Sequence, residues 1–292
     1  MDQAEQLRNV IKVHNQNNMN TARVVAVTSG KGGVGKSNVS VNLAACLRKA
    51  GKRVIIFDAD FGLANIEIMF GAMPKYNLSD VIFHGKSIQE IITQGPMEIG
   101  FISGGSGIVS LNGLQPEQIK YLVKSINELN NLAEYIIIDT GAGISEQVLE
   151  FVVTSPEIIL VTTPEPTSLT DSYSLLKTLF KKKEFNPNET VIHVVANKVH
   201  STEDARAVYE KLNSVIAQFL HGNLNYLGMI PQDLAVEHAV RQQKVVSISE
   251  PNSKAAKAFE ILASNLLQDA GEETQPRRGL AQLFASLFNR KN

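Results

Sequence analysis

Cysteine is scarce in this sequence: Cys46 is the one cysteine among 292 residues. A lone thiol forms no disulfide within the chain, which suits a reducing cytoplasm. It also falls short of the thiolates that an iron–sulfur cluster bridging two subunits would need. Cys46 lies in the apolar run from Val41 to Leu47. We therefore expect it to be a small, buried residue of a helix.

Long apolar stretches and an excess of charge are missing as well. No stretch approaches the roughly 20 apolar residues of a membrane-spanning helix, and the polar start from Met1 to Arg8 has no apolar core of a signal peptide. The formal net charge is −1, so any attraction to nucleic acid or membrane must be local. We expect a cytoplasmic protein whose membrane contact is at most peripheral.

Short apolar runs alternating with helical patterns fill most of the chain. Seven runs are continuous, which is typical of parallel strands buried on both faces. They are Val24–Thr28, Arg53–Phe57, Ile99–Ser103, Tyr135–Asp139, Ile158–Thr162, Val191–Ala196 and Tyr226–Ile230. Helical patterns cover 39–50, 116–132 and 168–183. This alternation predicts an α/β fold with a doubly wound, mainly parallel sheet flanked by helices, with its ligand beyond the carboxyl ends of the strands.

A phosphate-binding loop follows the first predicted strand. The stretch from Gly30 to Ser37 matches G-x-x-x-x-G-K-[ST] and precedes a helix, which is the context that confirms this motif. Backbone N–H groups and the helix N-terminus there bind phosphate oxygens. Lys36 should reach the β- and γ-phosphates, and the Ser37 hydroxyl should ligate Mg²⁺. The sequence thus predicts ATP or ADP with Mg²⁺ as cofactors, bound by Gly32, Gly33, Val34, Gly35, Lys36, Ser37 and Asn38.

Lys31 makes the motif more specific. The stretch KGGVGKS from Lys31 to Ser37 resembles the deviant Walker A signature of the family that includes MinD, ParA and the nitrogenase iron protein. In that family the first lysine reaches across a dimer to the partner's nucleotide. The resemblance therefore implies a MinD-like P-loop NTPase fold, an intermolecular role for Lys31, and slow ATP hydrolysis that depends on a homodimer.

Three aspartates at strand ends extend the resemblance. Asp58 and Asp60 look like the family's first switch, in which Asp58 would hold the Mg²⁺ hydration shell and Asp60 would orient or deprotonate the attacking water. Asp139 looks like Walker B and would hold Mg²⁺ through water; Gly141, in the second switch, stands where relatives often have proline. The alternative for either residue of the first pair is a helix cap. The resemblance implies Lys31, Lys36 and Asp60 as catalytic residues and Ser37, Asp58 and Asp139 as metal ligands.

Base recognition is assigned by the same resemblance to Asn197, Pro231 and Asp233, at the ends of two further predicted strands. In the family, the corresponding asparagine and the stretch after the proline contact adenine. From the residues alone, a strand-end asparagine or a Pro-x-Asp turn is more often a simple cap.

The last segment has an apolar helix face made of Leu280, Leu283, Phe284, Leu287 and Phe288. Arg277, Arg278, Arg290 and Lys291 flank it. This pattern is typical of an in-plane membrane helix or a partner-binding helix. A helix packed on the core is the alternative, which the acidic linker before the segment disfavours. We expect it to bind anionic lipid at the inner face of the cell membrane in the ATP state.

The N-terminus narrows the resemblance to one branch of the family. Residues 2–8, DQAEQLR, match the Asp-Gln-Ala-x-x-Leu-Arg motif at the start of the flagellar-number regulators called FlhG, YlxH or FleN. In that branch the segment stimulates FlhF, a GTPase of the signal-recognition type. The resemblance implies that Asp2, Gln3, Leu7 and Arg8 bind such a partner. Residues 1–22 are too polar to fold alone, so we expect a flexible segment.

These features predict an ATP-dependent, dimerising switch that regulates flagellar number and placement. Its expected parts are an activator segment at 1–22, a MinD-like ATPase domain at 23–268, and a linker with a membrane-targeting helix at 269–292. Expected partners are an FlhF-like GTPase, anionic lipid and a second copy, with flagellar switch-complex (C-ring) proteins as further candidates. The alternatives are a ParA-type DNA partition ATPase, which the near-neutral charge disfavours, a MinD-type cell-division ATPase, and a scaffold that binds nucleotide without hydrolysis.

Overall fold

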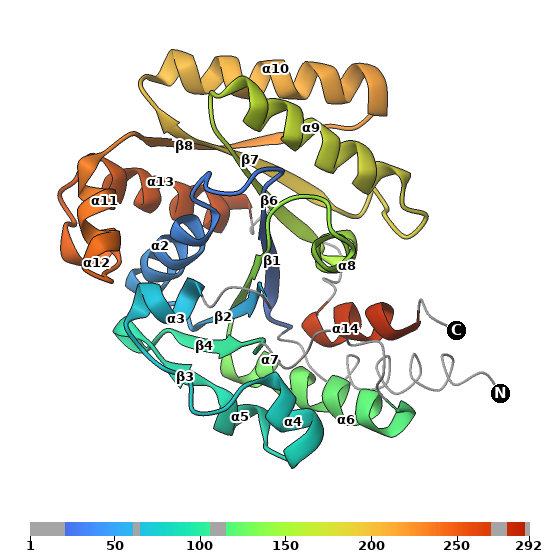
Figure 1. Ribbon diagram of the computed structural model, residues 1–292. Coiled ribbons are helices and arrows are strands. Elements are labelled where there is room, and N and C mark those ends of the chain that lie inside the picture. Colours follow the sequence, from blue (N-terminus) through green and yellow to red (C-terminus); the bar gives the residue numbers. More distant parts are fainter. Residues whose placement is uncertain (1–20, 61–64, 106–114, 270–278, 290–292) are drawn as a thin grey trace.

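A computed structural model describes residues 21–60, 65–105, 115–269 and 279–289 of the chain. Their strands form one sheet of eight, in the order β3-β4-β2-β5-β1-β6-β7-β8 (Figure 1). All neighbouring strands are parallel except β3 and β4. The strands are β1 Arg23–Thr28, β2 Val54–Ala59, β3 Thr93–Gln94, β4 Gly100–Ser103, β5 Tyr135–Thr140, β6 Glu157–Thr162, β7 Val191–Val199 and β8 Asn225–Pro231.

The predicted doubly wound sheet is confirmed, and each of the seven predicted strands is present with its ends shifted by a few residues at most. The sequence reading missed β3, because two residues at a sheet edge leave no apolar run. The predicted helix over 116–132 is divided into α6 (Pro116–Asn127) and α7 (Leu129–Leu132).

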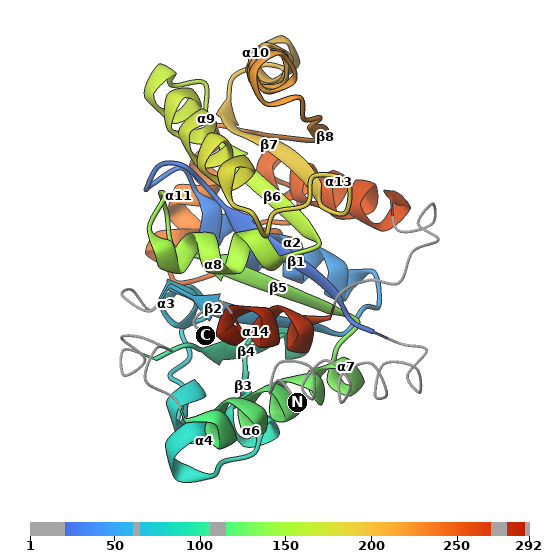
Figure 2. The same ribbon diagram turned by 90° about the vertical axis from the view of Figure 1, so that its right-hand side faces the viewer.

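Helices cover both faces of the sheet (Figure 2). One face packs against α2 (Lys36–Lys49), α3 (Asn65–Phe70), α11 (Leu234–Arg241), α12 (Val246–Ser249) and α13 (Lys254–Asp269). The other packs against α4 (Leu78–His84), α5 (Ile88–Ile91), α6, α7, α8 (Glu146–Thr154), α9 (Pro166–Lys181), α10 (Thr202–Leu220) and α14 (Leu280–Asn289).

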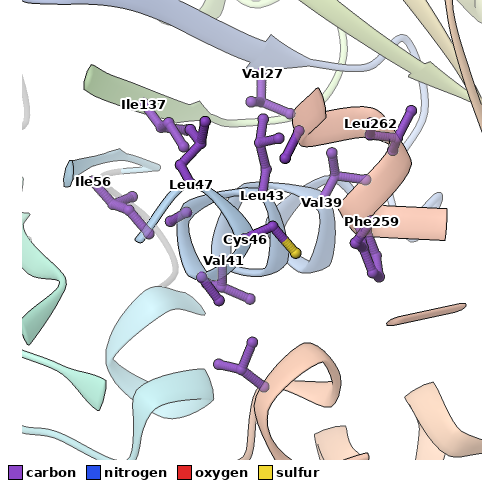
Figure 3. Close-up of a cluster of buried hydrophobic side chains, with 14 of the residues drawn as sticks. Val27, Val39, Val41, Leu43, Cys46, Leu47, Ile56, Ile137, Phe259 and Leu262 are labelled. Carbon is purple, nitrogen blue, oxygen red and sulfur yellow. The ribbon is translucent and has the colours of Figure 1, made fainter. Parts of the chain in front are cut away.

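Successive residues of β1 face opposite layers, so its apolar run is continuous. Val25 and Val27 belong to the first layer, and Val24 and Ala26 to the second. Figure 3 shows the first layer around α2, with Cys46 among the apolar side chains. Cys46 is 4% exposed, which confirms its interpretation as a buried helix residue.

The C-terminal helix α14 lies on the second layer, beside α6 and α8 (Figure 2). Leu280, Leu283 and Phe284 are at most 2% exposed. The ring of Phe284 makes edge contacts with Phe57 on β2 and Phe151 on α8, with centroids 5.6 and 5.8 Å apart. Burial of this face therefore secures the helix to the domain.

This packing corrects one expectation from the sequence. The helix itself is where the pattern predicted it, but the interpretation that disfavoured packing on the core is wrong for this structure. Removal of the apolar face from water explains why the helix packs on the domain. The side chains of Leu287 and Phe288 lie outside the described part. Within the described ranges, no helix combines the length and the apolar composition needed to cross a bilayer.

Candidate functional site

Five strands bring the predicted site residues to one edge of the sheet. β1 leads into the loop from Gly30 to Ser37, while β2 and β5 carry Asp58 and Asp139. β7 and β8 carry Asn197 and Pro231 near their carboxyl ends. The structure therefore gathers these candidates where a doubly wound sheet binds its ligand.

The phosphate loop needs its glycines for two separate reasons. Gly33 and Gly35 have φ angles of 76° and 93°, in the left-handed region that favours glycine. A Cβ on Gly30 would lie 2.2 Å from the backbone carbon of Asp171 in α9, so only glycine allows this approach. Gly35 begins α2 without a side-chain cap, which leaves the first-turn N–H groups to an anion.

Two aspartates lie side by side below this loop. Asp58 and Asp139 are neighbours in the β2–β5 register and are 2% and 0% exposed. The Ser37 hydroxyl donates to Asp139 Oδ2 at 2.7 Å, whereas Lys36 Nζ lies 3.5 Å from Asp139 Oδ1. Burial, followed by the charge of Asp139, raises the pKa of Asp58 to about 8. The pair is short of positive charge, and its hard oxygen ligands suit Mg²⁺.

Asp60 lies where the two predicted switches meet. Its half-buried carboxylate accepts a hydrogen bond from Asn65 Nδ2 at 3.4 Å. A Cβ on Gly141 would lie 3.9 Å from its Oδ1. Gly143 of the second switch donates its N–H to the carbonyl of Ser29, the residue before the phosphate loop, at 2.9 Å. The start of the phosphate loop is thus hydrogen-bonded to the segment that faces Asp60.

Lys31 contacts its own chain in this structure. Its Nζ lies 2.7 Å from Glu165 Oε2 and donates to Thr167 Oγ1 at 2.8 Å, at the start of α9. The hydrogen bond from Lys31 lowers the pKa of Glu165. A Lys31 that reaches a partner's nucleotide must first leave these two residues.

The end of β7 contacts the phosphate loop directly. Asn197 Nδ2 donates to the Val34 carbonyl at 2.7 Å, and a Cβ on Gly35 would lie 2.4 Å from the same nitrogen. Lys198, with a left-handed φ of 57°, donates from Nζ to the Gly33 carbonyl at 2.9 Å. These contacts position the loop, and the assignment of Asn197 to adenine stays a prediction.

Asp233 has a structural role that limits its predicted one. Its carboxylate accepts from the N–H groups of Ala235 and Ala255, both at 3.0 Å, and caps α11. The Asp233 side chain is therefore occupied as a cap, and a contact with adenine from this turn would have to come from the backbone around Pro231 and Asp233. Adenine contact from these two residues stays a prediction.

Sequence reasoning missed three residues of the site. Ser40 is fully buried, and its hydroxyl donates to Asp139 Oδ1 at 2.7 Å. Its signal was available, because Ser40 follows Ser37 by one helical turn and shares its face. Glu165 and Lys198 gave no such signal, since their contacts depend on loops that meet only in the folded chain. The predicted partner-binding residues Asp2, Gln3, Leu7 and Arg8 lie outside the described residues.

The comparisons with known proteins agree with this site. Residues 20–267 match the ParA family model, described as an NUBPL iron-transfer P-loop NTPase. The antiactivator FleN of Pseudomonas aeruginosa is 39% identical over 85% of this chain and 87% of its own length. The flagellum site-determining protein YlxH of Helicobacter pylori is 33% identical over 98% of both chains.

The fold agrees with solved structures. MinD of Pyrococcus horikoshii, a septum site-determining protein solved with Mg-ADP, superposes with a TM-score of 0.67 at 25% identity. The match covers 86% of this chain and 98% of MinD. The residue pattern, the geometry and the relatives thus point to one family.

Proposed function

Because this chain belongs to the ParA/MinD family of P-loop ATPases, in the branch of FleN and YlxH, we propose that it regulates flagella by switching between a single chain and an ATP-held homodimer. It is an ATPase with ATP or ADP and Mg²⁺ as cofactors. The observation that carries the proposal is the conjunction of a complete phosphate loop with Lys31, whose present partners lie in its own chain.

The residues divide the work of hydrolysis between them. Lys36 and the first turn of α2 hold the phosphates. Ser37, Asp58 and Asp139 would hold a Mg²⁺ ion, which would offset the negative charge of the phosphates and carboxylates. Asp60 orients the attacking water and accepts its proton at a carboxylate oxygen. Lys31, once it has left Glu165, stabilises charge on the partner's phosphates, which makes turnover depend on the dimer.

The position of α14 supports a membrane contact that depends on the nucleotide. Phe284 contacts Phe57, the neighbour of Asp58 in sequence, and Phe151 on the helix that follows the second switch. A shift of either element on ATP binding changes the surface under α14 and favours its release. One short helix binds a bilayer weakly, whereas two on one dimer bind far more strongly through effective concentration.

The N-terminal segment supplies the partner function. In this proposal residues 1–22 act on an FlhF-like GTPase, with Leu7 as the anchor and Gln3 or Arg8 as the group that enters the partner's nucleotide site. Flagellar switch-complex proteins are a further class of partner. The observation behind this part is the sequence motif at residues 2–8, together with the FleN and YlxH relatives.

The dimer is tested by measuring molecular mass in solution with ADP and with a non-hydrolysable ATP analogue. We expect a single chain with ADP and a dimer with the analogue. Asp60→Ala should form the dimer with ATP itself, because bound ATP persists. If Asp60→Ala stays a single chain in saturating ATP at every protein concentration, the proposed switch is wrong.

Membrane binding is tested by sedimentation with phosphatidylglycerol-containing vesicles, using phosphatidylcholine vesicles as the control. The full chain with the ATP analogue should sediment with the anionic vesicles, and a chain that ends at Asp269 should remain in the supernatant. Equal sedimentation of both chains would contradict the role of α14.

The N-terminal role is tested with a synthetic peptide of residues 1–22. It should raise GTP turnover by an FlhF-like GTPase, and the Gln3→Ala or Arg8→Ala peptide should do so less well than a peptide of unchanged sequence. A scrambled peptide is the control. An inert peptide, together with a full effect from a chain lacking residues 1–20, would exclude this role.

A further inference from the structure

The two ends of the ATPase domain meet at one buried contact. The N–H of Ala22, the second residue of the described chain, donates to Asn130 Oδ1 on α7 at 3.1 Å. Gly279 precedes α14 and is buried against the same place, since a Cβ there would lie 2.9 Å from Thr21 Cγ2 and 3.7 Å from the amide of Asn130. We call Thr21, Ala22, Asn130 and Gly279 the terminal junction.

Gly279 links this junction to the docked helix. Its carbonyl accepts the N–H groups of Gln282 and Leu283 at 3.1 and 3.2 Å, so it is part of the first turn of α14. The next residues, Leu280 and Ala281, are 1% and 2% exposed in the same apolar layer as Ala22. A movement of α14 away from the layer must therefore remove Gly279 from Thr21 and Asn130.

A second link joins the same region to the end of α13. The Arg23 guanidinium donates to the Leu266 carbonyl at 2.6 Å and to Glu157 Oε2 at 2.7 Å. His193, which is 1% exposed, has its Nδ1 3.9 Å from Asp269 Oδ2 at the end of α13. Leu266 near the end of α13 and Gly279 before α14 thus both contact residues 21–23, and the contacts of Arg23 are made without α14.

We propose that the terminal junction couples the two functional ends of the chain. While α14 is docked, Gly279 packs against Thr21 and against Asn130, which accepts the Ala22 N–H. When α14 leaves, Thr21 and Asn130 lose this packing, which weakens the hold of Asn130 on the base of the N-terminal segment. The inference rests on the proposed function in taking the N-terminal segment as the part that binds a GTPase and α14 as the part that binds lipid.

Coupling of this kind is reciprocal. A partner that binds residues 1–20 and displaces Thr21 and Ala22 weakens the docking of α14 by the same factor by which release of α14 favours the partner. Lipid binding at one end and GTPase binding at the other should therefore promote each other. If the two ends were independent, the affinity for lipid would be the same with and without the GTPase bound, and the affinity for the GTPase would be the same with and without lipid.

The coupling is tested by hydrogen exchange of the full-length protein, followed by NMR, with each variant read at the other end. Asn130→Ala removes the acceptor of the Ala22 N–H, and its informative readout is the amides of Leu283 to Ala285. Gly279→Val places a branched side chain against Thr21, and its informative readout is the Ala22 amide. Asn131→Ala is the control, since this exposed neighbour lies on the same α7.

We expect Asn130→Ala to speed exchange at α14 by about fivefold, the effect of losing one ordinary hydrogen bond. Gly279→Val should speed exchange at Ala22 because the added side chain forces Thr21 and Gly279 apart, while Asn131→Ala exchanges like wild type. If Asn130→Ala speeds only the Ala22 amide, or Gly279→Val speeds only the amides of α14, the ends are independent and the proposal is wrong. Should Gly279→Val fail to fold, Asn130→Ala alone decides.

A vesicle measurement separates this proposal from the proposed function. With the ATP analogue and phosphatidylglycerol-containing vesicles, the Ala22 amide of the wild type should exchange several times faster than without vesicles. Vesicle binding with unchanged exchange at Ala22 would overturn the coupling. Absence of vesicle binding would contradict the membrane role of α14, and the exchange of the two variants would then decide the coupling on its own.

Discussion

Buried ionisable groups lie at both ends of the strands, and their pKa values are shifted in opposite directions. At the carboxyl ends of the strands, Asp58 and Asp139 lie side by side with Lys36 Nζ 3.5 Å away, and the pKa of Asp58 is raised to about 8. At the amino ends, the Arg23 guanidinium contacts both carboxylate oxygens of Glu157. Burial raises the pKa of Glu157, but the neighbouring His193 and Arg23 outweigh burial and lower it.

The opposite pKa shifts distinguish a ligand-binding site, at Asp58 and Asp139, from a structural ion pair, at Arg23 and Glu157. A buried carboxylate pair with one lysine at 3.5 Å is costly in the free protein and is stabilised when a divalent cation binds, which suits a site that binds Mg²⁺ with nucleotide. A two-pronged Arg–Glu pair needs nothing from outside, so it fixes the positions of β1, β6 and α13. Both clusters are equally buried, so burial alone does not identify function.

The largest effect should come from Asp60→Ala. Loss of the group that orients and deprotonates water should lower ATP turnover by about 100- to 1,000-fold. Nucleotide affinity should remain within about threefold, because the phosphate loop and the Asp58–Asp139 pair are unchanged. Asp80→Ala is the matched control. It removes a carboxylate on α4 that pairs with His84 and has no contact with the phosphate loop in the described structure, so this variant should turn over ATP like wild type. A small loss of turnover would assign the proton acceptor to another residue.

A large effect of another kind is expected at the opposite edge. Arg23→Met leaves the Glu157 carboxylate buried without its partner and should lower the free energy of unfolding by about 3 kcal/mol. Chemical denaturation without nucleotide measures this loss, and the ADP affinity of the folded variant should be unchanged. The double variant Arg23→Met, Glu157→Met should recover most of the stability. If ADP affinity falls together with stability, the two edges are not separable as we argue.

Sequence reasoning reached the nucleotide edge more completely than the rest of the molecule. The loop from Gly30 to Ser37 and the aspartates at strand ends are local patterns, and continuous apolar strands place them at one edge of the sheet. The predicted sheet and the buried Cys46 were confirmed for the same reason, because periodicity and strand length are properties of neighbouring residues.

Contacts between distant segments were beyond that reasoning. The pairing of Lys31 with Glu165 and of Lys198 with Gly33 depends on how loops meet after folding. The apolar face of α14 was found from its spacing, yet spacing cannot say whether bilayer or domain covers it. The edge at Arg23, Glu157 and His193 gave no signal at all, since single charged residues at the starts of strands look like ordinary surface positions.

A smaller effect is expected from pH, with opposite signs at the two edges. The raised pKa of Asp58 means that the Mg²⁺-free folded protein holds a proton that the unfolded chain has lost above about pH 4. Stability from this group is therefore full below that pH and falls as the pH rises towards 8, because the unfolded chain has then released the proton that the folded protein still holds. The lowered pKa of Glu157 contributes stability above about pH 4.5 that is lost on further acidification. Denaturation between pH 5 and pH 8 measures the first slope, which Asp58→Asn should flatten; an equally steep slope in that variant would place the titrating group elsewhere.

The smallest effect tests a residue that the Walker motif does not include. The Ser40 hydroxyl donates to the Asp139 oxygen that also faces Lys36, at 2.7 Å, whereas Ser37 donates to the other oxygen. Ser40→Ala leaves the carboxylate with one donor fewer, and in the nucleotide complex Mg²⁺ near Ser37 and Asp139 should compensate in part. We therefore expect Ser40→Ala to weaken Mg-ADP binding by only about three- to tenfold, the range of one hydrogen bond to a charged group with partial compensation.

Ser37→Ala, which removes a predicted metal ligand, should weaken binding more. Ser174→Ala removes a hydroxyl that donates to the Thr170 carbonyl on α9, and it should have no effect. Isothermal titration calorimetry of the three variants gives the order. If Ser40→Ala costs as much as Ser37→Ala, the orientation of Asp139 by Ser40 matters as much as direct ligation, and the nucleotide edge extends one helical turn further into α2 than the motif indicates.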